Sequence, residues 1–214
     1  MAREEVLKPS LIQRLVRYCH YIQARHTIEC PRTISSVEIA EFTDIDESQV
    51  RKDLAMIDVK GTPRVGYQTP EVINAIHNLL GFERELIAVL IGAGKLGGAI
   101  ACYRGFDHYG LRVVAIFDVS PEKVGSTVCD IVVEPMERLE RTIARTGVRT
   151  AILTVPAEAA QSLAQRLAKA GIKAIWNFAP ARFTAPEGVL VHHQHLSVGL
   201  AELAHFLKHS GPRR

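Results

Sequence analysis

Three glycines and one aspartate stand at a spacing that indicates chemistry. Gly92, Gly94 and Gly97 form a G-x-G-x-x-G motif directly after the apolar run Leu86–Ile91, and a helix-forming stretch follows them. Glycine suits such a turn because the backbone must approach a phosphate closely, and the amides at the start of the next helix then bind the anion. Asp118 ends the next apolar run, 21 positions after Gly97. This pattern predicts a dinucleotide-binding site.

The carboxylate of Asp118 also predicts which dinucleotide binds. It can accept hydrogen bonds from both hydroxyls of an adenosine ribose, and it would repel a 2′-phosphate. We therefore expect NADH or NAD⁺ as the ligand, in preference to NADP. Candidate cofactor contacts are the motif residues and residues at the ends of two later apolar segments: Gly92, Ala93, Gly94, Lys95, Leu96, Gly97, Thr154, Val155, Pro156 and Asn177. The segment that Asn177 begins, through Phe178, Ala179 and Pro180, is also expected to line the site. The alternative is a structural glycine turn in which Asp118 caps the end of a strand.

Residues suited to catalysis are scarce beside this motif. No Ser-x-x-x-x-Tyr-x-x-x-Lys arrangement follows it, and no His/Asp pair is placed for proton transfer. His193 and His195 would share one face of a strand, but strand histidines are more often plain polar residues, so we expect no metal site. The cysteines have no C-x-x-C spacing, which indicates neither a zinc knuckle nor a dithiol switch. They are Cys19, Cys30, Cys102 and Cys129. We expect no enzyme; a small NAD-dependent oxidoreductase is the alternative.

The N-terminal third has the helix pattern of a DNA-binding module. A first amphipathic helix has the stripe Leu11, Leu15, Tyr18 and Ile22. Ser35-x-x-Glu38 is a capping box that opens a short second helix, and Asp46-x-x-Gln49 caps a third, whose apolar stripe is Val50, Leu54 and Ile57. Two short helices joined by the tight turn 43–45 have the proportions of a helix-turn-helix.

The outer face of the third helix is polar and basic. Residues 58–68 then contain turn glycines and alternating valines, which predicts a β-hairpin wing. Side chains of these types suit phosphates and base edges. The predicted DNA contacts on the helix and the wing are Ser48, Gln49, Arg51, Lys52, Lys60 and Arg64. The alternative is a structural domain in which the three helices pack together and the charged face is simply exposed to solvent, without binding DNA.

Further elements complete an α/β chain. Thr69, with Pro70 after it, is expected to cap a connector helix that stops at Gly81. Apolar segments then alternate with helical stretches, which favours a doubly wound Rossmann sheet. The predicted strands are 86–91, 111–117, 150–155, 172–176 and 188–191, and the helical stretches are 98–103, 134–145 and 157–170. A last helix starts at Ser197. We expect three parts: 1–80 for DNA binding, 81–196 for the dinucleotide and 197–214 for dimerisation.

Composition limits the classes that remain. Apolar residues make up 47% and charged residues 23% of the 214, which excludes wholesale disorder. The longest apolar run, 86–94, is far shorter than the roughly 20 residues needed to cross a bilayer. The charged start predicts no secretory signal, so we expect a cytoplasmic protein without a membrane partner. Residues 1–80 hold ten Lys and Arg against eleven Asp and Glu, so any DNA footprint must be a local patch.

A helix-turn-helix joined to a compact NAD-type domain without catalytic residues resembles the Rex family of redox-sensing transcriptional repressors. The resemblance covers nearly the whole chain. It is carried by Arg14-Leu15 with Tyr18, Gln49-Val50-Arg51-Lys52-Asp53-Leu54, Gly61, Gly66-Tyr67, Gly92 to Ile100, Tyr103-Arg104-Gly105-Phe106, Phe117-Asp118-Val119-Ser120-Pro121-Glu122-Lys123 and Asn177-Phe178-Ala179-Pro180. The recognition-helix segment and the Phe-Asp-Val-x-Pro segment together are specific.

This resemblance implies a winged helix-turn-helix domain, a Rossmann domain and a homodimer whose terminal helix swaps between subunits. It implies repression at a palindromic operator and release of the DNA by NADH but not by NAD⁺. It adds Arg14 to the DNA-binding set and places Tyr103 and Phe106 near the nicotinamide. A regulator that binds another nucleotide ligand, such as coenzyme A, stays open as an alternative, because related Rossmann domains bind it.

The sequence departs from the family pattern at three places. Asp58, Lys60, Pro63 and Arg64 break the glycine- and phenylalanine-rich wing, which puts the operator preference in doubt. Lys95 replaces the usual Asn of the glycine loop and could add a phosphate contact. His195 stands where the family commonly has an Asp that is thought to couple the two domains. With histidine there, we expect the coupling to be weaker or dependent on pH.

Overall fold

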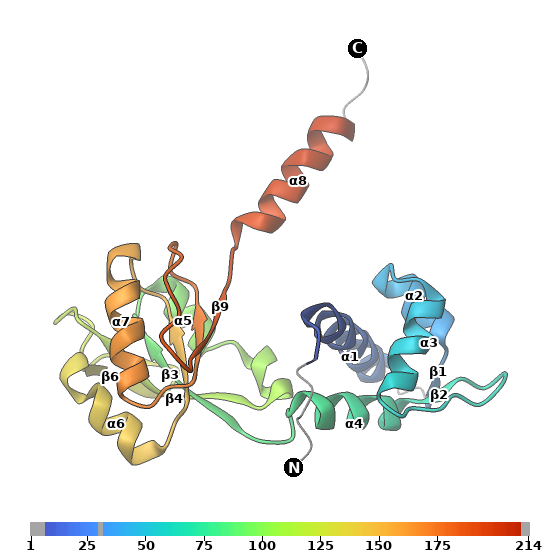
Figure 1. The fold of residues 1–214 in the computed structure, drawn as a ribbon, viewed down its shortest axis with the longest axis horizontal. Coiled ribbons are helices and arrows are strands. Elements are labelled where there is room, and N and C mark those ends of the chain that lie inside the picture. Colours follow the sequence, from blue (N-terminus) through green and yellow to red (C-terminus); the bar gives the residue numbers. More distant parts are fainter. Residues whose placement is uncertain (1–6, 30–31, 211–214) are drawn as a thin grey trace. The chain divides into compact units, whose positions relative to one another are not determined.

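The computed structural model describes residues 7–29 and 32–210 (Figure 1). The chain divides into two compact units, Met1–Arg84 and Glu85–Arg214. The first unit contains α1 (Pro9–Glu29), β1 (Thr33–Ile34), α2 (Ser36–Thr43), α3 (Glu47–Met56), β2 (Tyr67–Gln68) and α4 (Thr69–Leu80). The second contains β3 (Leu86–Ile91), α5 (Lys95–Ala101), η1 (Arg104–Tyr109), β4 (Leu111–Asp118), β5 (Thr127–Val128), β6 (Ile131–Pro135), η2 (Met136–Arg138), α6 (Leu139–Thr146), β7 (Thr150–Leu153), α7 (Ala157–Lys169), β8 (Ala174–Asn177), β9 (Leu190–His193) and α8 (Ser197–Ser210).

The three helices predicted for the first unit are confirmed, together with their caps. The stripe of α1 is buried, with Leu15, Tyr18 and Ile22 at 0% exposure. The Ser35–Glu38 capping box is formed at the start of α2. The carboxylate of Asp46 accepts hydrogen bonds from two backbone N–H groups in the first turn of α3. Because the turn between α2 and α3 is so short, the two helices pack directly on α1 and form a helix-turn-helix.

The predicted wing hairpin is present but is only one bridge long. The antiparallel ladder joins β1 to β2, with Thr33 opposite Gln68 and Ile34 opposite Tyr67. Inside 58–68, the described pairing is the single bridge between Thr62 and Gly66. Gly66 has a φ of +95°, and a Cβ there would lie 2.5 Å from the carbonyl oxygen of Ile34. The hairpin is therefore shorter than the alternating valines predict, and its base at Gly66 packs closely against β1.

The connector helix α4 begins one residue earlier than expected. Gln68 is its N-cap, and no side-chain capping hydrogen bond is formed. The hydroxyl of Thr69 is buried and has no hydrogen-bond partner among the described residues, so its predicted capping role is wrong. The predicted stop is confirmed, because Gly81 adopts a left-handed conformation with a φ of +75°.

The second unit is a seven-stranded sheet with the order β5-β6-β4-β3-β7-β8-β9. All neighbours are parallel except β5 and β6. The six parallel strands have the Rossmann order, which confirms the predicted fold class. The strand β6 was not predicted, because Glu134 and Pro135 were included in a helical stretch. Pro135 instead ends the strand, and the helix starts only after the turn of η2.

Helices cover both faces of this sheet, which explains why its strands are continuous apolar runs. On one face, α6 and α7 pack through Leu139 and Leu167 against residues such as Ile91 and Phe117. On the other face, α5 packs through Ile100. The apolar side chains of α8 are exposed by 53–70%. Of the helices within residues 7–29 and 32–210, none combines the length and apolar character that a membrane span needs.

Candidate dinucleotide and DNA-binding sites

The glycine loop lies between β3 and α5, as the motif predicts. Gly92 has a φ of +103°, and Gly97 faces it across the turn. A Cβ at Gly97 would lie 2.0 Å from the carbonyl oxygen of Gly92 and 2.7 Å from the hydroxyl of Thr154, so only glycine fits there. Gly94, the N-cap of α5, has no atom within 4 Å of such a Cβ. Its surface is therefore open for a phosphate to approach the backbone.

Asp118 closes this site at the end of β4. Its Oδ2 atom accepts hydrogen bonds from the backbone N–H of Ala93 at 2.7 Å and from the Lys123 ammonium at 3.1 Å. Its Oδ1 atom accepts one from the N–H of Ser120 at 2.9 Å. Burial works against the charge, but these donors outweigh it and hold the pKa of Asp118 below its usual range. The carboxylate is therefore ionised at neutral pH and acts as an acceptor.

A cavity of about 530 Å³ opens beside the glycine loop and Asp118. Seven predicted cofactor residues line it: Gly92, Gly94, Leu96, Asp118, Thr154, Val155 and Pro156. Phe178 and Pro180, from the segment predicted to line the site, do so as well. The sequence reasoning missed several others: Val119, Ser120, Lys123, Met136, Ala159 and Leu163. Lys123 stands five residues after Asp118, so its proximity could have been expected from the tight turn that follows a Rossmann strand.

Asn177 does not line this cavity. Its side chain is 1% exposed, and its polar atoms are occupied by its own loop and by Nδ1 of His193 on β9, at 3.0 Å. Its Oδ1 atom accepts a hydrogen bond from the N–H of Ala179 at 3.1 Å, and its amide donates to the carbonyl of Ala181 at 3.0 Å. Asn177 therefore shapes the loop that carries Phe178. Ala93 and Lys95 belong to the glycine loop without lining the cavity, and Lys95 is exposed at the start of α5.

Tyr103 and Phe106 line a second cavity of about 320 Å³, which is not the one beside the glycine loop. A series of aromatic rings joins the two cavities. Tyr103 and Phe106 have centroids 4.8 Å apart, and Phe106 lies 5.5 Å from Trp176. Trp176 is in turn 4.8 Å from Phe178, which lines the first cavity. The structure therefore connects the two predicted nicotinamide neighbours to the main cavity through Trp176 and Phe178.

On the first unit, the exposed face of α3 presents Ser48, Arg51 and Lys52, as predicted. Arg51 forms an ion pair with Glu47 at 3.0 Å, one turn earlier. It also lines a hollow of about 410 Å³ between α3 and the wing, and Arg64 lines the same hollow from the wing side. Arg64 and Lys60 are both exposed. Two arginines from separate elements thus share one surface.

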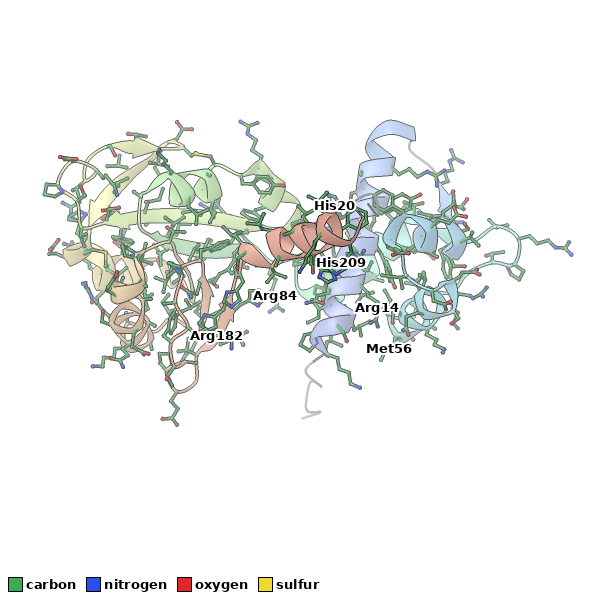
Figure 2. The ribbon with its side chains drawn as sticks, turned by 90° about the horizontal axis from the view of Figure 1, so that it is seen from above. Arg14, His20, Met56, Arg84, Arg182 and His209 are labelled. Carbon is green, nitrogen blue, oxygen red and sulfur yellow. A yellow bond between two sulfur atoms is a disulfide. The ribbon has the colours of Figure 1, made fainter. Side chains whose placement is uncertain are left out.

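Two predicted DNA contacts have partners inside the unit. The guanidinium of Arg14, labelled in Figure 2, donates to both carboxylate oxygens of Asp53 at 2.6 and 2.8 Å. The Gln49 amide and the Tyr18 hydroxyl donate to the same carboxylate, at 2.8 and 2.9 Å. Asp53 is 1% exposed and joins α3 to α1. Arg14 therefore links α1 to α3 in this structure, and its contact with DNA stays a prediction.

The histidines of the second unit were considered as metal ligands. The rings of His193 and His195 lie 6.5 Å apart, and across residues 7–29 and 32–210 no group of three metal-ligating side chains gathers.

Cys102 and Cys129, 27 residues apart, are joined in a disulfide with a Cα–Cα distance of 5.5 Å. The absence of C-x-x-C spacing therefore does not exclude a cysteine pair. Sequence spacing could not find this pair, because the fold brings the end of α5 to the β5–β6 turn.

Comparisons with known proteins agree with this arrangement. Residues 9–55 match the family described as putative DNA-binding protein N-terminus, and residues 83–181 match the CoA binding domain family. The redox-sensing transcriptional repressor Rex of Brevibacillus brevis is 37% identical over 97% of this chain and 100% of its own length. Rex of Porphyromonas gingivalis strain W83 is 40% identical over 95% of this chain and 93% of its own.

Solved structures give the same result. The crystal structure of RSP in complex with β-NADH matches with a TM-score of 0.86 and 35% identity over 96% of each chain. RSP in complex with β-NAD⁺ and operator DNA matches with the same score and identity, over 96% of this chain and 94% of that one. A further structure is of RSP as a Rex-family repressor.

A helix-turn-helix unit followed by a nucleotide-binding Rossmann domain defines a DNA-binding regulator with a sensor domain. The relatives match it over nearly their whole length. The chain belongs to the Rex family of redox-sensing transcriptional repressors.

Proposed function

We propose that this chain is a cytoplasmic repressor that binds a palindromic operator as a homodimer and leaves the DNA when NADH binds. One observation supports this above all others. A single chain holds an exposed polar face on α3 and, in its other unit, a cavity between a glycine loop and the ionised Asp118. Binding of NADH by the relative RSP, and of operator DNA by the same relative, supports the same two ligands here.

The residues of the second unit suit a dinucleotide as follows. The pyrophosphate would lie on the open backbone at Gly94 and the N-terminus of α5, where the helix dipole favours an anion. The adenosine ribose would donate its hydroxyls to Asp118. The nicotinamide would lie toward Phe178 and the aromatic series, where a neutral reduced ring is better accommodated than a cation. This charge difference is the basis on which NADH and NAD⁺ would be distinguished.

Release of DNA needs two states with different affinities for NADH. A dimer that reads two half-sites must hold its recognition helices about 34 Å apart, one turn of the duplex. NADH would favour a dimer in which this distance no longer matches the operator. Ser48, Arg51 and Lys52 of α3 and Lys60 and Arg64 of the wing would make the contacts to DNA. The exposed apolar side chains of α8 would be buried in the dimer, with the helix swapped between subunits.

The experiment is an anisotropy titration of a labelled DNA fragment from the promoter of the protein's own gene. We expect tight binding without ligand or with NAD⁺, and release on addition of NADH. Binding that NADH leaves unchanged would overturn the sensor assignment but not DNA binding. A coenzyme A arm belongs in the same titration, because residues 83–181 match the CoA binding domain family. Release by coenzyme A and not by NADH would establish that second candidate.

An enzymatic role is the remaining alternative. The repressor assignment predicts that NADH is bound without being consumed. NADH absorbance followed over hours with a panel of small carbonyl compounds should therefore stay at its background rate. Turnover that depends on the protein and is lost in Asp118→Ala would make the chain an oxidoreductase.

A further inference from the structure

We infer that Cys102 and Cys129 form a reversible thiol–disulfide site, through which low-molecular-weight thiols and disulfides adjust the affinity of the second unit for NADH. This inference rests on the proposed function, because NADH affinity is the quantity that it changes. It goes beyond that function by giving the sensor a second redox input, which is separate from the ratio of NADH to NAD⁺.

The disulfide between the two cysteines joins the end of a helix to the turn of a hairpin. Cys102 is the C-cap residue of α5, and its N–H donates to the carbonyl of Gly98 at 3.1 Å. Cys129 lies in the turn between β5 and β6, where it and Asp130 both adopt positive φ angles, +48° and +64°. Their Cα–Cα distance of 5.5 Å is within the usual range for a disulfide. The bond therefore fixes the end of α5 to the tip of this hairpin.

Both of these elements continue into the walls of the dinucleotide cavity. The helix α5 follows directly on its N-cap Gly94 in the glycine loop and ends, about two turns later, at its C-cap Cys102. Residues 119–126 connect Asp118 to the β5–β6 hairpin. This segment includes Ser120 and Lys123, which line the cavity. Backbone hydrogen bonds tie this segment to β6, among them Gly125 N–H to Val133 O at 2.9 Å. The disulfide thus cross-links the wall formed by Gly94 and α5, where the phosphates would bind, to the wall formed by Asp118 and residues 119–126, where the ribose would bind.

The pair is also open to reagents. Both cysteines are exposed, and an exposed disulfide exchanges readily with thiols. A repressor works where its DNA is, in a compartment rich in thiols, where the disulfides that do form are mostly transient or redox-sensing. Cys19 differs, because it is buried and its burial raises the pKa of its thiol to about 11. It is therefore not a competing nucleophile.

The reaction is ordinary thiol–disulfide exchange. In oxidation, one cysteine thiolate attacks a small disulfide such as oxidised glutathione, forming a mixed disulfide and releasing one thiolate. The second cysteine thiolate then attacks the protein sulfur of that mixed disulfide. The Cys102–Cys129 bond forms, the second small thiolate leaves, and the cysteines have given two electrons to the small disulfide and two protons to solvent. Reduction by a thiol runs the same steps in reverse.

The cross-link should strengthen NADH binding. With the bond formed, the two walls are held at the spacing seen here, so less conformational freedom is lost when the ligand enters. With the bond broken, the hairpin can separate from α5, and part of the binding free energy must restore the spacing. We expect the Kd for NADH to rise by roughly 5-fold or more on reduction, the lower end of typical coupling between sites.

The test uses the full-length protein, equilibrated in reduced or oxidised glutathione buffers. Alkylation followed by mass spectrometry of peptides reports whether Cys102 and Cys129 are paired, and NADH fluorescence gives the Kd in each buffer. We expect pairing in the oxidised buffer alone, together with the tighter Kd. The double variant Cys102→Ser with Cys129→Ser should bind NADH with the weaker affinity in both buffers. Cys30→Ser, which changes a cysteine outside the described residues, should respond like the wild type.

Three outcomes would overturn the inference. The first is failure of the two cysteines to pair in fully oxidised glutathione. The second is an NADH Kd in the reduced protein that equals or is lower than that of the oxidised protein. The third is an unchanged redox response in the double serine variant. If the cysteines pair and separate as expected but neither form binds NADH, the proposed function has failed as well, and the alkylation data distinguish this from a failure of the thiol chemistry.

Discussion

The ammonium nitrogen of Lys123 lies 3.1 Å from Oδ2 of Asp118, the carboxylate at the end of β4. These two residues are the charged groups that line the dinucleotide cavity. The preference for NAD over NADP was predicted from the carboxylate alone. With the lysine beside it, the site holds a cation that could accept a 2′-phosphate if the carboxylate were removed.

The first prediction therefore concerns Asp118 and Lys123 together. Asp118→Ala should weaken NADH binding about 10-fold or more, because a hydrogen bond to a charged acceptor contributes about 1.5–3 kcal/mol. The same change frees Lys123 and should raise the affinity for NADPH relative to NADH. Lys123→Ala should leave NADH affinity within a few-fold and weaken NADPH. Fluorescence titrations with both dinucleotides measure this. Unchanged NADH affinity in Asp118→Ala would show that the ribose lies elsewhere.

A second prediction separates three glycines of the loop and its helix. Gly97→Ala should prevent proper folding of the second unit, because the new Cβ would overlap the carbonyl of Gly92. Gly94→Ala should fold normally, since nothing lies within 4 Å, but should weaken NADH binding by blocking the approach of the pyrophosphate. Gly98→Ala, whose Cβ would meet only Val128 at 3.8 Å, is the matched control and should do neither. Circular dichroism and NADH titration distinguish the three. Equal NADH affinity in Gly94→Ala and Gly98→Ala would exclude phosphate binding at this turn.

A third prediction tests the recognition surface. Lys52→Ala should weaken operator binding and reduce the slope of log affinity against log salt concentration by about 1, as loss of one phosphate contact does. NADH affinity should not change, because Lys52 belongs to the other unit. Lys169→Ala, an exposed lysine on α7, is the control and should leave operator binding unaltered. If the two variants bound the operator equally well, the recognition face would have to be placed elsewhere.

A fourth prediction concerns the shared carboxylate of Asp53. Burial opposes its charge, but hydrogen bonds from Arg14, Gln49 and Tyr18 lower its pKa in the folded protein. A lowered pKa means that the carboxylate stabilises the fold above its unfolded pKa of about 3.9, and that this stability is lost as pH falls through the folded value. Asp53→Asn should therefore lower the free energy of unfolding by about 3 kcal/mol at pH 7.

Urea unfolding of wild type and Asp53→Asn at pH 7 and pH 3 measures this effect. The difference between the two proteins should shrink at pH 3, because the carboxylate of the unfolded wild-type chain, with a pKa of about 3.9, is mostly protonated there and part of the stability due to the lowered folded pKa is lost. Asp44→Asn provides the control, because Asp44 is exposed and its left-handed backbone, with a φ of +53°, suits asparagine equally well. A stability difference that is the same at both pH values would contradict the role given to the Asp53 charge.

The features that could be predicted from the sequence are those governed by local rules. The stripe of α1, the caps of α2 and α3 and the glycine loop each depend on residues a few positions apart. The features that were missed depend on tertiary contacts. Asp53 falls within a recognition-helix segment, and only the packing of α1 on α3 shows that its carboxylate pairs with Arg14. Likewise, Cys102 and Cys129 meet only because the hairpin β5–β6 folds back beside α5.

The position of Trp176 provides a built-in optical probe. It is the one tryptophan of the 214 residues, so its emission belongs to a single place in the molecule. Its ring lies 4.8 Å from that of Phe178, which lines the dinucleotide cavity, and 5.5 Å from that of Phe106, which lines the second cavity. Tryptophan emission overlaps the absorption band of the reduced nicotinamide but not of the oxidised one. The wild-type protein can therefore report occupancy by NADH through energy transfer, without any attached dye.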